Sequence, residues 1–276
     1  MNNLLDAIVN IHKRGNLTIK EFYKSRNRAN NMGEALELFI CDAFANTLSS
    51  SNPKEANDAY NQTFSYLGNQ NNPPDAILKN GDAIEVKKIE AHGSSLALNS
   101  SYPKSKLLAN SPMITKNCKN CEIWCEKDII YSVGVVNDRK ILALCFVYGE
   151  DYAAEKQVYE RIRETIKTGI GSIPNVEFGE TKELGRINRV DPLGITYLRI
   201  RGMWGIENPF ETFNYISSEP FFAIINFAKY NSFPLESRNK IENTNGIVIA
   251  SCKIKNPNNP AQLKDARLIS FMGAEK

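Results

Sequence analysis

The sequence lacks the features of membrane and secreted proteins. Its N-terminus has no basic segment followed by an apolar one, and its longest apolar stretch, residues 141–148, is far shorter than the ~20 residues that a membrane span needs. The 276 residues include only 6 cysteines, which without a secretory signal are more typical of reduced thiols or metal ligands than of a disulfide framework. These absences predict an intracellular protein that contacts no membrane.

The sequence also lacks a strong net charge. Its 34 basic and 31 acidic residues leave a formal charge of +3, which is too small to predict a polyanionic partner by itself. Two stretches show a local excess of basic residues. The first, residues 182–201, contains Lys182, Arg186, Arg189, Arg199 and Arg201 against only Glu183 and Asp191. The second contains Lys20, Lys24, Arg26 and Arg28. Such a local excess suits a face that binds a phosphate backbone, although a solvated surface explains either stretch equally well.

Apolar periodicity predicts helices before and after a mixed sheet. Helices are expected at 4–12, 19–28, 33–48 and 153–168, and strands at 129–136, 141–148, 195–200, 221–227 and 246–253. The polar segment 49–74, rich in Asn, Gln and Pro, is expected to be a loop with a short strand near 64–67. No internal repeat or low-complexity linker divides the chain. We therefore expect one α/β domain over residues 1–276, with a mixed central sheet flanked by helices.

The segment 74–87 carries the most informative pattern. Ile84 and Val86 alternate with Glu85 and Lys87, so a strand here buries the aliphatic pair and presents a carboxylate beside an amine on its other face. The preceding strand contains Asp75, and a turn at Asn80-Gly81 separates the two. The segment is therefore a hairpin with three chemically useful side chains.

The length of the turn decides whether these side chains meet. A loop of residues 79–81, closed by Gly81 in the left-handed conformation, pairs Asp75 with Glu85 and puts their Cβ atoms ~5 Å apart on one face. A shorter Asn80-Gly81 loop would pair Asp75 with Val86 and send the two carboxylates to opposite faces. The predicted site therefore requires the longer loop.

Two carboxylates at this separation favour a hard cation between them. Asp75 and Glu85 are the oxygen ligands that Mg²⁺ accepts, while the ion keeps waters and binds a substrate phosphate. Lys87 would then activate or orient the attacking water, and phosphodiester hydrolysis is the natural use of such a site. A solvated hairpin with a surface ion pair remains the alternative.

One further acid is a candidate for the site. In the helix expected at 33–48, Glu37 lies about 90° from the centre of the apolar stripe and could reach the hairpin, whereas Glu34 should face solvent. The sequence Glu180-Thr181-Lys182 repeats the Glu-x-Lys pattern but lacks an upstream Pro-Asp, so we treat it as a decoy.

Longer tracts resemble a known family. Asp75, Glu85 and Lys87 match the motif of the PD-(D/E)XK nuclease superfamily, and residues 26–37 resemble the helix that often donates a further acid. Residues 95–103 and 189–204 resemble the NgoPII family of type II restriction endonucleases, and the similarity extends over most of the chain.

The resemblance implies a restriction endonuclease-like fold and a bacterial, cytoplasmic, Mg²⁺-dependent homodimer. Such an enzyme would cleave double-stranded DNA at a short palindrome, GGCC, leaving 5′-phosphate ends, alongside a cognate DNA methyltransferase. Residues 1–170 would form the catalytic core and 171–276 a DNA-recognition elaboration.

Several basic residues are candidates for contacts with DNA. Arg199 and Arg201 share one face of a strand and suit bidentate readout of guanine, although phosphate contacts and a structural ion pair are also open. The residues expected to contact backbone phosphates are Arg186, Arg189, Lys104 and Lys106.

The cysteines leave a different class of function open. Cys118, Cys121 and Cys125 lie close together, but a structural zinc site usually has two tight doublets and four ligands, so reduced thiols are the better interpretation. The alternatives to a restriction enzyme are a repair or junction-resolving nuclease of the same fold and a non-catalytic, zinc-stabilised nucleic-acid-binding module.

Overall fold

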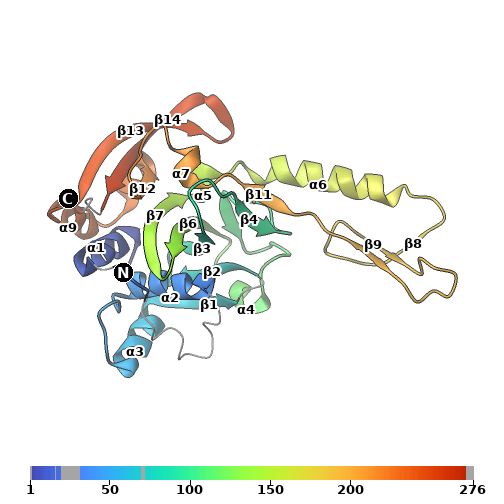
Figure 1. Cartoon of the computed structure of the whole chain (residues 1–276), viewed down its shortest axis with the longest axis horizontal. Coiled ribbons are helices and arrows are strands. Elements are labelled where there is room, and N and C mark those ends of the chain that lie inside the picture. The colour runs from blue at the N-terminus through green and yellow to red at the C-terminus, as the bar shows by residue number, and fades with distance from the viewer. Residues whose placement is uncertain (1, 16, 20–31, 70–71, 272–276) are drawn as a thin grey trace.

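A mixed β-sheet forms the centre of the molecule, and helices pack against it (Figure 1). The computed structural model describes residues 2–15, 17–19, 32–69 and 72–271. Its described strands follow the order β1-β2-β3-β6-β7-β12-β14-β13, with β5 paired to β6. Strands β3 and β6 run parallel, as do β7 and β12, while the other neighbours in that order run antiparallel. The predicted fold class, a mixed sheet flanked by helices, is confirmed.

The elements have the following bounds. The helices are α1 (Leu4–Arg14), α2 (Met32–Ala45), α3 (Pro53–Thr63), α4 (Lys116–Lys119), α5 (Gly149–Tyr152), α6 (Lys156–Gly171), α7 (Pro209–Thr212), α8 (Phe227–Ser232) and α9 (Leu235–Glu242). The strands of the central sheet are β1 (Phe64–Asn69), β2 (Asn72–Leu78), β3 (Ala83–Ile89), β5 (Lys106–Leu108), β6 (Glu126–Asn137), β7 (Lys140–Tyr148), β12 (Phe221–Asn226), β13 (Val248–Asn256) and β14 (Asn259–Ser270). The remaining strands are β4 (Leu96–Asn99), β8 (Glu177–Phe178), β9 (Gly185–Asn188), β10 (Leu198–Ile200) and β11 (Trp204–Ile206).

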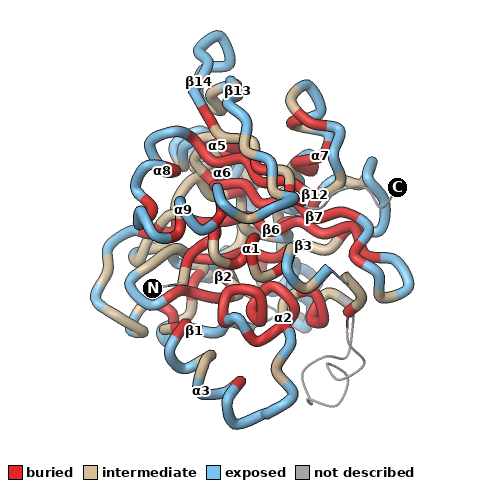
Figure 2. Tube along the Cα trace, turned by 90° about the vertical axis from the view of Figure 1, so that its left-hand side faces the viewer, coloured by how far each residue is buried: buried red, intermediate tan, exposed pale blue. Residues whose placement is uncertain are grey.

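The central strands are buried on both faces. In β7, Leu144, Phe146 and Tyr148 pack into the core that includes α1 and α2, whereas Cys145 and Val147 pack into a second core on the opposite face. Figure 2 shows buried residues along β6, β7, β12 and α2, and exposed residues along the outer part of the β13–β14 hairpin. The sheet is therefore a rigid support for side chains at its margin.

One sequence expectation fails, one strand was not expected, and two expectations lie outside the described residues. The predicted loop 49–74 contains α3, because Asn52 caps that helix through Lys54 N at 3.0 Å and a proline occupies its first turn. Strand β14 was not expected. The helix predicted at 19–28 and the basic stretch 20–28 fall, apart from Ile19, outside the described residues.

An arm projects from this body (Figure 1). We define the arm as residues 156–203, which comprise α6, the three-stranded sheet β10-β9-β8 and the residues that lead from it to β11. The chain returns from the arm through β11, which pairs with β4. The predicted division at residue 170 into a catalytic core and a recognition elaboration stays a prediction. Strands from both sides of that position build the central sheet. Among the described helices, none is long and apolar enough to span a bilayer.

Candidate active site

The hairpin β2–β3 has the register that the catalytic interpretation requires. Ala76 pairs with Ile84 and Ile77 with Ala83, and Leu78 N donates to Asp82 O at 3.0 Å, so the loop comprises residues 79–81. Continuing this register puts Asp75 opposite Glu85. One detail of the prediction is wrong, because the left-handed residue is Asn80, with φ of 52°, and not Gly81. Asparagine tolerates this conformation, so the loop keeps its length.

The three motif residues lie together at the end of this hairpin. Val86 N donates a hydrogen bond of 2.6 Å to Asp75 Oδ2, which fixes the carboxylate against the neighbouring strand. Lys87 Nζ lies 2.6 Å from Glu85 Oε1. Glu85 Oε2 is buried and has no hydrogen-bond partner among the described residues. A buried carboxylate oxygen without a partner is costly unless another ligand completes it.

The charges of the site are strongly coupled. Burial raises the pKa of Asp75 well above its usual range, and the neighbouring Glu85 raises it further against the opposing effect of Lys87. Burial alone would lower the pKa of Lys87, but the carboxylates of Glu85 and Asp75 outweigh it and raise that pKa. Two close carboxylates with one ammonium leave an excess of negative charge, which a divalent cation would neutralise.

Helix α2 brings a third carboxylate to the same place. Burial raises the pKa of Glu37 to about 7, Lys87 lowers it, and Glu85 and Glu34 raise it, so this side chain lies within electrostatic range of the hairpin. Glu34 was predicted to face solvent, but it is buried, 7% exposed. The prediction fails because α2 is covered on most of its circumference, so a position away from the apolar stripe is not a position in water.

The motif residues line a cavity of about 700 Å³ that lies between the body and the arm. Asp75, Glu85 and Lys87 line one side of it, and Lys182, Glu183, Arg201 and Met203 line another. The pairing of β4 with β11 brings these sides together, since Trp204 pairs with Asn99 and Ile206 with Leu96. Residues 95–103 and 189–204, the tracts with the family resemblance, therefore meet at this cavity.

Arg199 and Arg201 share a single acidic partner. Arg199 Nη2 lies 2.6 Å and Arg201 Nε 2.5 Å from Glu183 Oε1. The shared partner confirms that both side chains lie on one face. The hydrogen bonds from the two arginines lower the pKa of Glu183 to about 2. Both guanidiniums nevertheless remain exposed. Glu183 was missed as a site residue, although two arginines spaced by one residue call for a shared counter-ion.

Lys104 lines the same cavity as Asp75, Glu85 and Lys87. Its Nζ donates to Ser101 Oγ, and its backbone N donates to the Tyr131 hydroxyl at 2.7 Å. Burial lowers the pKa of Lys104 to about 8, while Glu85 raises it and Lys87 lowers it by smaller effects. Tyr131, which pairs with Glu85 in the sheet register, was not singled out from the sequence.

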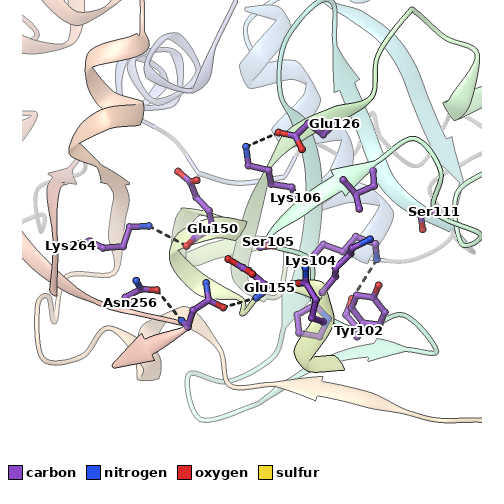
Figure 3. A pocket seen from close by; sticks show the side chains of 15 residues that line it. Tyr102, Lys104, Ser105, Lys106, Ser111, Glu126, Glu150, Glu155, Asn256 and Lys264 are labelled. Carbon is purple, nitrogen blue, oxygen red and sulfur yellow. Dashed lines mark hydrogen bonds and ion pairs between the residues drawn. The ribbon is translucent and has the colours of Figure 1, made fainter. Parts of the chain in front are cut away.

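The other predicted phosphate contacts lie farther out. Lys106 is paired with Glu126 at 3.1 Å in a neighbouring cavity of about 400 Å³, which Lys104 also lines (Figure 3). Arg186 stacks over the Tyr197 ring at 4.8 Å, and Arg189 is exposed and 3.3 Å from Glu177. Both arginines lie on the arm.

The cysteine cluster forms no recognisable metal site within the described part of the chain. Cys118 is buried, Cys121 half-buried and Cys125 exposed, and all three are free thiols. Burial raises the pKa of Cys118 to about 12, which keeps its thiol protonated. No group of three or more His, Cys, Asp or Glu side chains in the described residues has the arrangement of a metal centre.

Comparison with known proteins decides the family. The NgoPII restriction endonuclease family matches residues 2–255. The type II restriction enzyme NgoPII of Neisseria gonorrhoeae is 51% identical over 276 residues, which cover 98% of this chain and 99% of that enzyme. The chain belongs to the NgoPII restriction endonuclease family. No solved structure matches it.

Membership in the NgoPII family confirms the resemblance and the class of enzyme that the sequence predicted, a type II restriction endonuclease that cleaves DNA. In this NgoPII-family chain the hairpin and the two resembling tracts line one cavity, and Glu37 lies within electrostatic range of Glu85 and Lys87. The roles of individual residues are proposals, which follow.

Proposed function

We propose that this enzyme hydrolyses both strands of double-stranded DNA at a short palindrome, GGCC, in a Mg²⁺-dependent reaction that leaves 5′-phosphate ends. The observation that carries the proposal is the grouping of Asp75, Glu85 and Lys87 in one cavity, with Glu85 Oε2 buried and unpartnered among the described residues. The proposed setting is the bacterial cytoplasm, where a cognate methyltransferase protects the same sequence.

Asp75 and Glu85 fit a divalent cation. They present carboxylate oxygens from adjacent strands, one oxygen lacks a partner, and burial together with mutual repulsion penalises two bare negative charges. Bound there, Mg²⁺ would supply Lewis-acid stabilisation of the phosphate charge and lower the pKa of a coordinated water. Glu37 is the candidate for a further ligand or water contact, because it lies within electrostatic range of the same hairpin.

Two lysines supply the positive charge of the site. Lys87 Nζ, 2.6 Å from Glu85 Oε1, is placed to orient the attacking water or to contact the scissile phosphate. Lys104 lines the same cavity and would hold a phosphate oxygen beside it. Neither role requires a change in the backbone of the hairpin.

The arm supplies the recognition surface. Arg201 lines the catalytic cavity, and Arg199 shares its counter-ion, so both arginines are placed to contact base edges or phosphates of DNA bound across the cavity. Arg186, Arg189 and Lys106 would contact the backbone farther from the cut. A homodimer would place one such site on each strand of a palindrome.

Digestion of plasmid DNA with Mg²⁺, followed by mapping of the ends, tests the proposal. We expect discrete fragments that end within GGCC and carry 5′-phosphates, with no cleavage in EDTA. Structure-dependent nicking without sequence preference would indicate a repair nuclease instead. Retarded but intact DNA would indicate a binding module.

A further inference from the structure

The loop 79–81 determines the geometry of the catalytic hairpin. The sequence also permits a two-residue loop, which would turn Asp75 and Glu85 to opposite faces of the sheet. Strand β3 is held in place by its continuous parallel pairing with β6 from Ala83 to Ile89. Strand β2 is less constrained, because its pairing with β1 is interrupted by register shifts. Contacts to the loop itself therefore have a strong influence on the form that the hairpin takes.

Two side chains from outside the hairpin bind the backbone of this loop. Asn80 N donates to Glu122 Oε2 at 3.1 Å, and Lys127 Nζ donates to Gly81 O at 2.8 Å. Glu122 and Lys127 also form an ion pair with each other, and their side chains are only 15% and 6% exposed. Burial raises the pKa of Glu122, but its hydrogen bonds with Lys127 and Asn80 N lower that pKa overall, so the carboxylate is charged at neutral pH. The pair therefore binds two consecutive residues of the loop.

The segment that carries this pair is anchored away from the hairpin. Lys127 belongs to β6, where it pairs with Leu107 of β5. Trp124 Nε1 donates to the backbone carbonyl of the buried Cys118 at 3.3 Å, and Lys127 Nζ lies 5.8 Å from the centre of the Trp124 ring. Helix α4, which contains Cys118, lies beside β1 and β2 (Figure 1). The cysteine-containing segment is therefore a support for the loop.

A change to the two-residue loop would break both contacts. A shift of one residue moves the strand backbone by about 3.3 Å, which is enough to separate a donor from its acceptor. Lys127 would then lose its carbonyl acceptor at a place that water scarcely reaches. Lys79 N is also held from outside, since it donates to Thr63 O at 2.9 Å, whereas in the shorter loop it would pair with Asp82. These contacts fit the longer loop and not the shorter one.

We propose that Glu122 and Lys127 are positioning residues for the reaction. They hold the loop in the form that brings Asp75 opposite Glu85, and so they set the separation of the two carboxylates. The inference rests on the proposed function, in which these carboxylates bind a divalent cation. It goes beyond that function by assigning control of the cation site to two residues outside the catalytic motif.

Binding of Mn²⁺ to the full chain without DNA, measured by isothermal titration calorimetry, tests the assignment. We expect Glu122→Ala and Lys127→Met to raise the dissociation constant for Mn²⁺ by roughly 10-fold or more, because residues that orient metal ligands have effects of this size. Glu122→Gln keeps an acceptor for Asn80 N and should lose less affinity than Glu122→Ala. Glu90→Ala, at an exposed acid just after β3, is the matched control and should bind Mn²⁺ as the natural protein does.

Hydrogen–deuterium exchange without metal supplies a second measurement, which does not depend on the cation. Exchange over residues 76–83 should be about 10-fold faster in Glu122→Ala and in Lys127→Met, because each variant loses a hydrogen bond to the loop. Exchange over residues 141–148 of β7 should not change.

The two measurements separate the possible failures. Faster exchange over both segments would show a general loss of stability and would overturn the positioning role. Natural Mn²⁺ affinity in variants whose loop exchanges faster would also overturn that role, and would leave the proposed function standing. A natural protein that binds no Mn²⁺ would refute the proposed cation site and the inference with it.

Discussion

Two clusters of charged side chains, one in the body and one on the arm, have inverse compositions. In the body, Lys229 Nζ lies between two acids, 2.8 Å from Asp82 Oδ1 and 2.6 Å from Asp128 Oδ2. On the arm, one acid, Glu183, lies between Arg199 and Arg201. A second lysine, Lys106, lies 3.4 Å from Asp128 Oδ1 and offsets the second acid of the body cluster, whereas the three side chains of the arm cluster keep an excess of one positive charge.

Their surroundings assign them different roles. The Lys229 side chain is 14% exposed and stands 4.8 Å from the centre of the Tyr148 ring, whereas Arg199 and Arg201 are 49% and 58% exposed. Lys229, in α8, bonds Asp82 at the turn of the β2–β3 hairpin and Asp128 in β6, so it stabilises the hairpin that carries Asp75 and Glu85. The arm cluster lies at the catalytic cavity, where unneutralised positive charge is available to a polyanion.

The largest expected effect concerns the hairpin that the body cluster supports. Glu85→Ala removes a proposed cation ligand, so cleavage of plasmid DNA should fall roughly 10³-fold or more, since several kcal/mol of transition-state stabilisation are lost. Specific binding, measured by gel shift in Ca²⁺, should survive, because loss of a carboxylate also removes repulsion of the scissile phosphate.

Two further variants keep this experiment interpretable. Glu85→Gln retains the shape of the side chain and should lose cleavage to a similar extent while unfolding at the same urea concentration as the natural protein. Glu180→Ala, in the exposed decoy motif, should cleave normally. Normal turnover by Glu85→Gln beside an inactive Glu180→Ala would refute the catalytic assignment.

The next prediction, on the unfolding free energy, tests whether the two clusters are equivalent. Lys229→Met leaves Asp82 and Asp128 facing each other, and breaking such a partly buried ionic cluster should cost about 3 kcal/mol of unfolding free energy. Burial raises the pKa of Asp128, but its bonds to Lys229 lower it overall, so this stabilisation is present at neutral pH and is lost as the pH falls through the depressed pKa.

Arg199→Ala provides the matched measurement on the arm. Its exposed ion pair should contribute far less to the unfolding free energy, because solvent screens it. Urea unfolding at pH 7 compares the two variants directly. Equal losses of stability would show that the arm cluster is as structural as the body cluster.

The sequence predicts the catalytic hairpin well because local rules determine it. Alternation in 84–87 fixes the faces, and the sequence leaves only two loop lengths open. The structure has the loop 79–81, the one that brings Asp75 opposite Glu85. The same applies to the β6–β7 hairpin, whose apolar arms flank a turn in which Asp138 and Arg139 have φ of 43° and 66°.

Features that depend on distant packing could not be predicted in this way. Glu34 is buried by elements that no helical periodicity reveals. Strand β14 forms a hairpin with β13, but its first five residues, 259–263, are exposed and show no apolar alternation that would identify a strand. Helix α3 has only Ala56 and Thr63 buried, so it lacks the apolar stripe that identifies a helix. The role of Glu183 depends on the pairing of β9 with β10 and on the position of the arm at the cavity.

Binding of DNA, with a smaller expected effect than the loss of cleavage in Glu85→Ala, sharpens the comparison at the arm itself. Arg201→Ala and Arg199→Ala should each cost ~1–3 kcal/mol of binding to a GGCC duplex if the side chain contacts a base, with a smaller loss on duplexes that lack the sequence. A phosphate contact would instead weaken binding to all duplexes equally and reduce the salt dependence by about one unit of slope. Arg189→Ala, exposed on the same arm and paired with Glu177, is the control for a general loss of positive charge. Gel shifts in Ca²⁺ at several salt concentrations separate these outcomes. Because Glu183 already accepts hydrogen bonds from both guanidiniums, DNA that binds through the same donors must compete with contacts of 2.5–2.6 Å. If both variants bind like the natural protein, that competition is never won, and the arginine pair belongs with Lys229 as part of the fold.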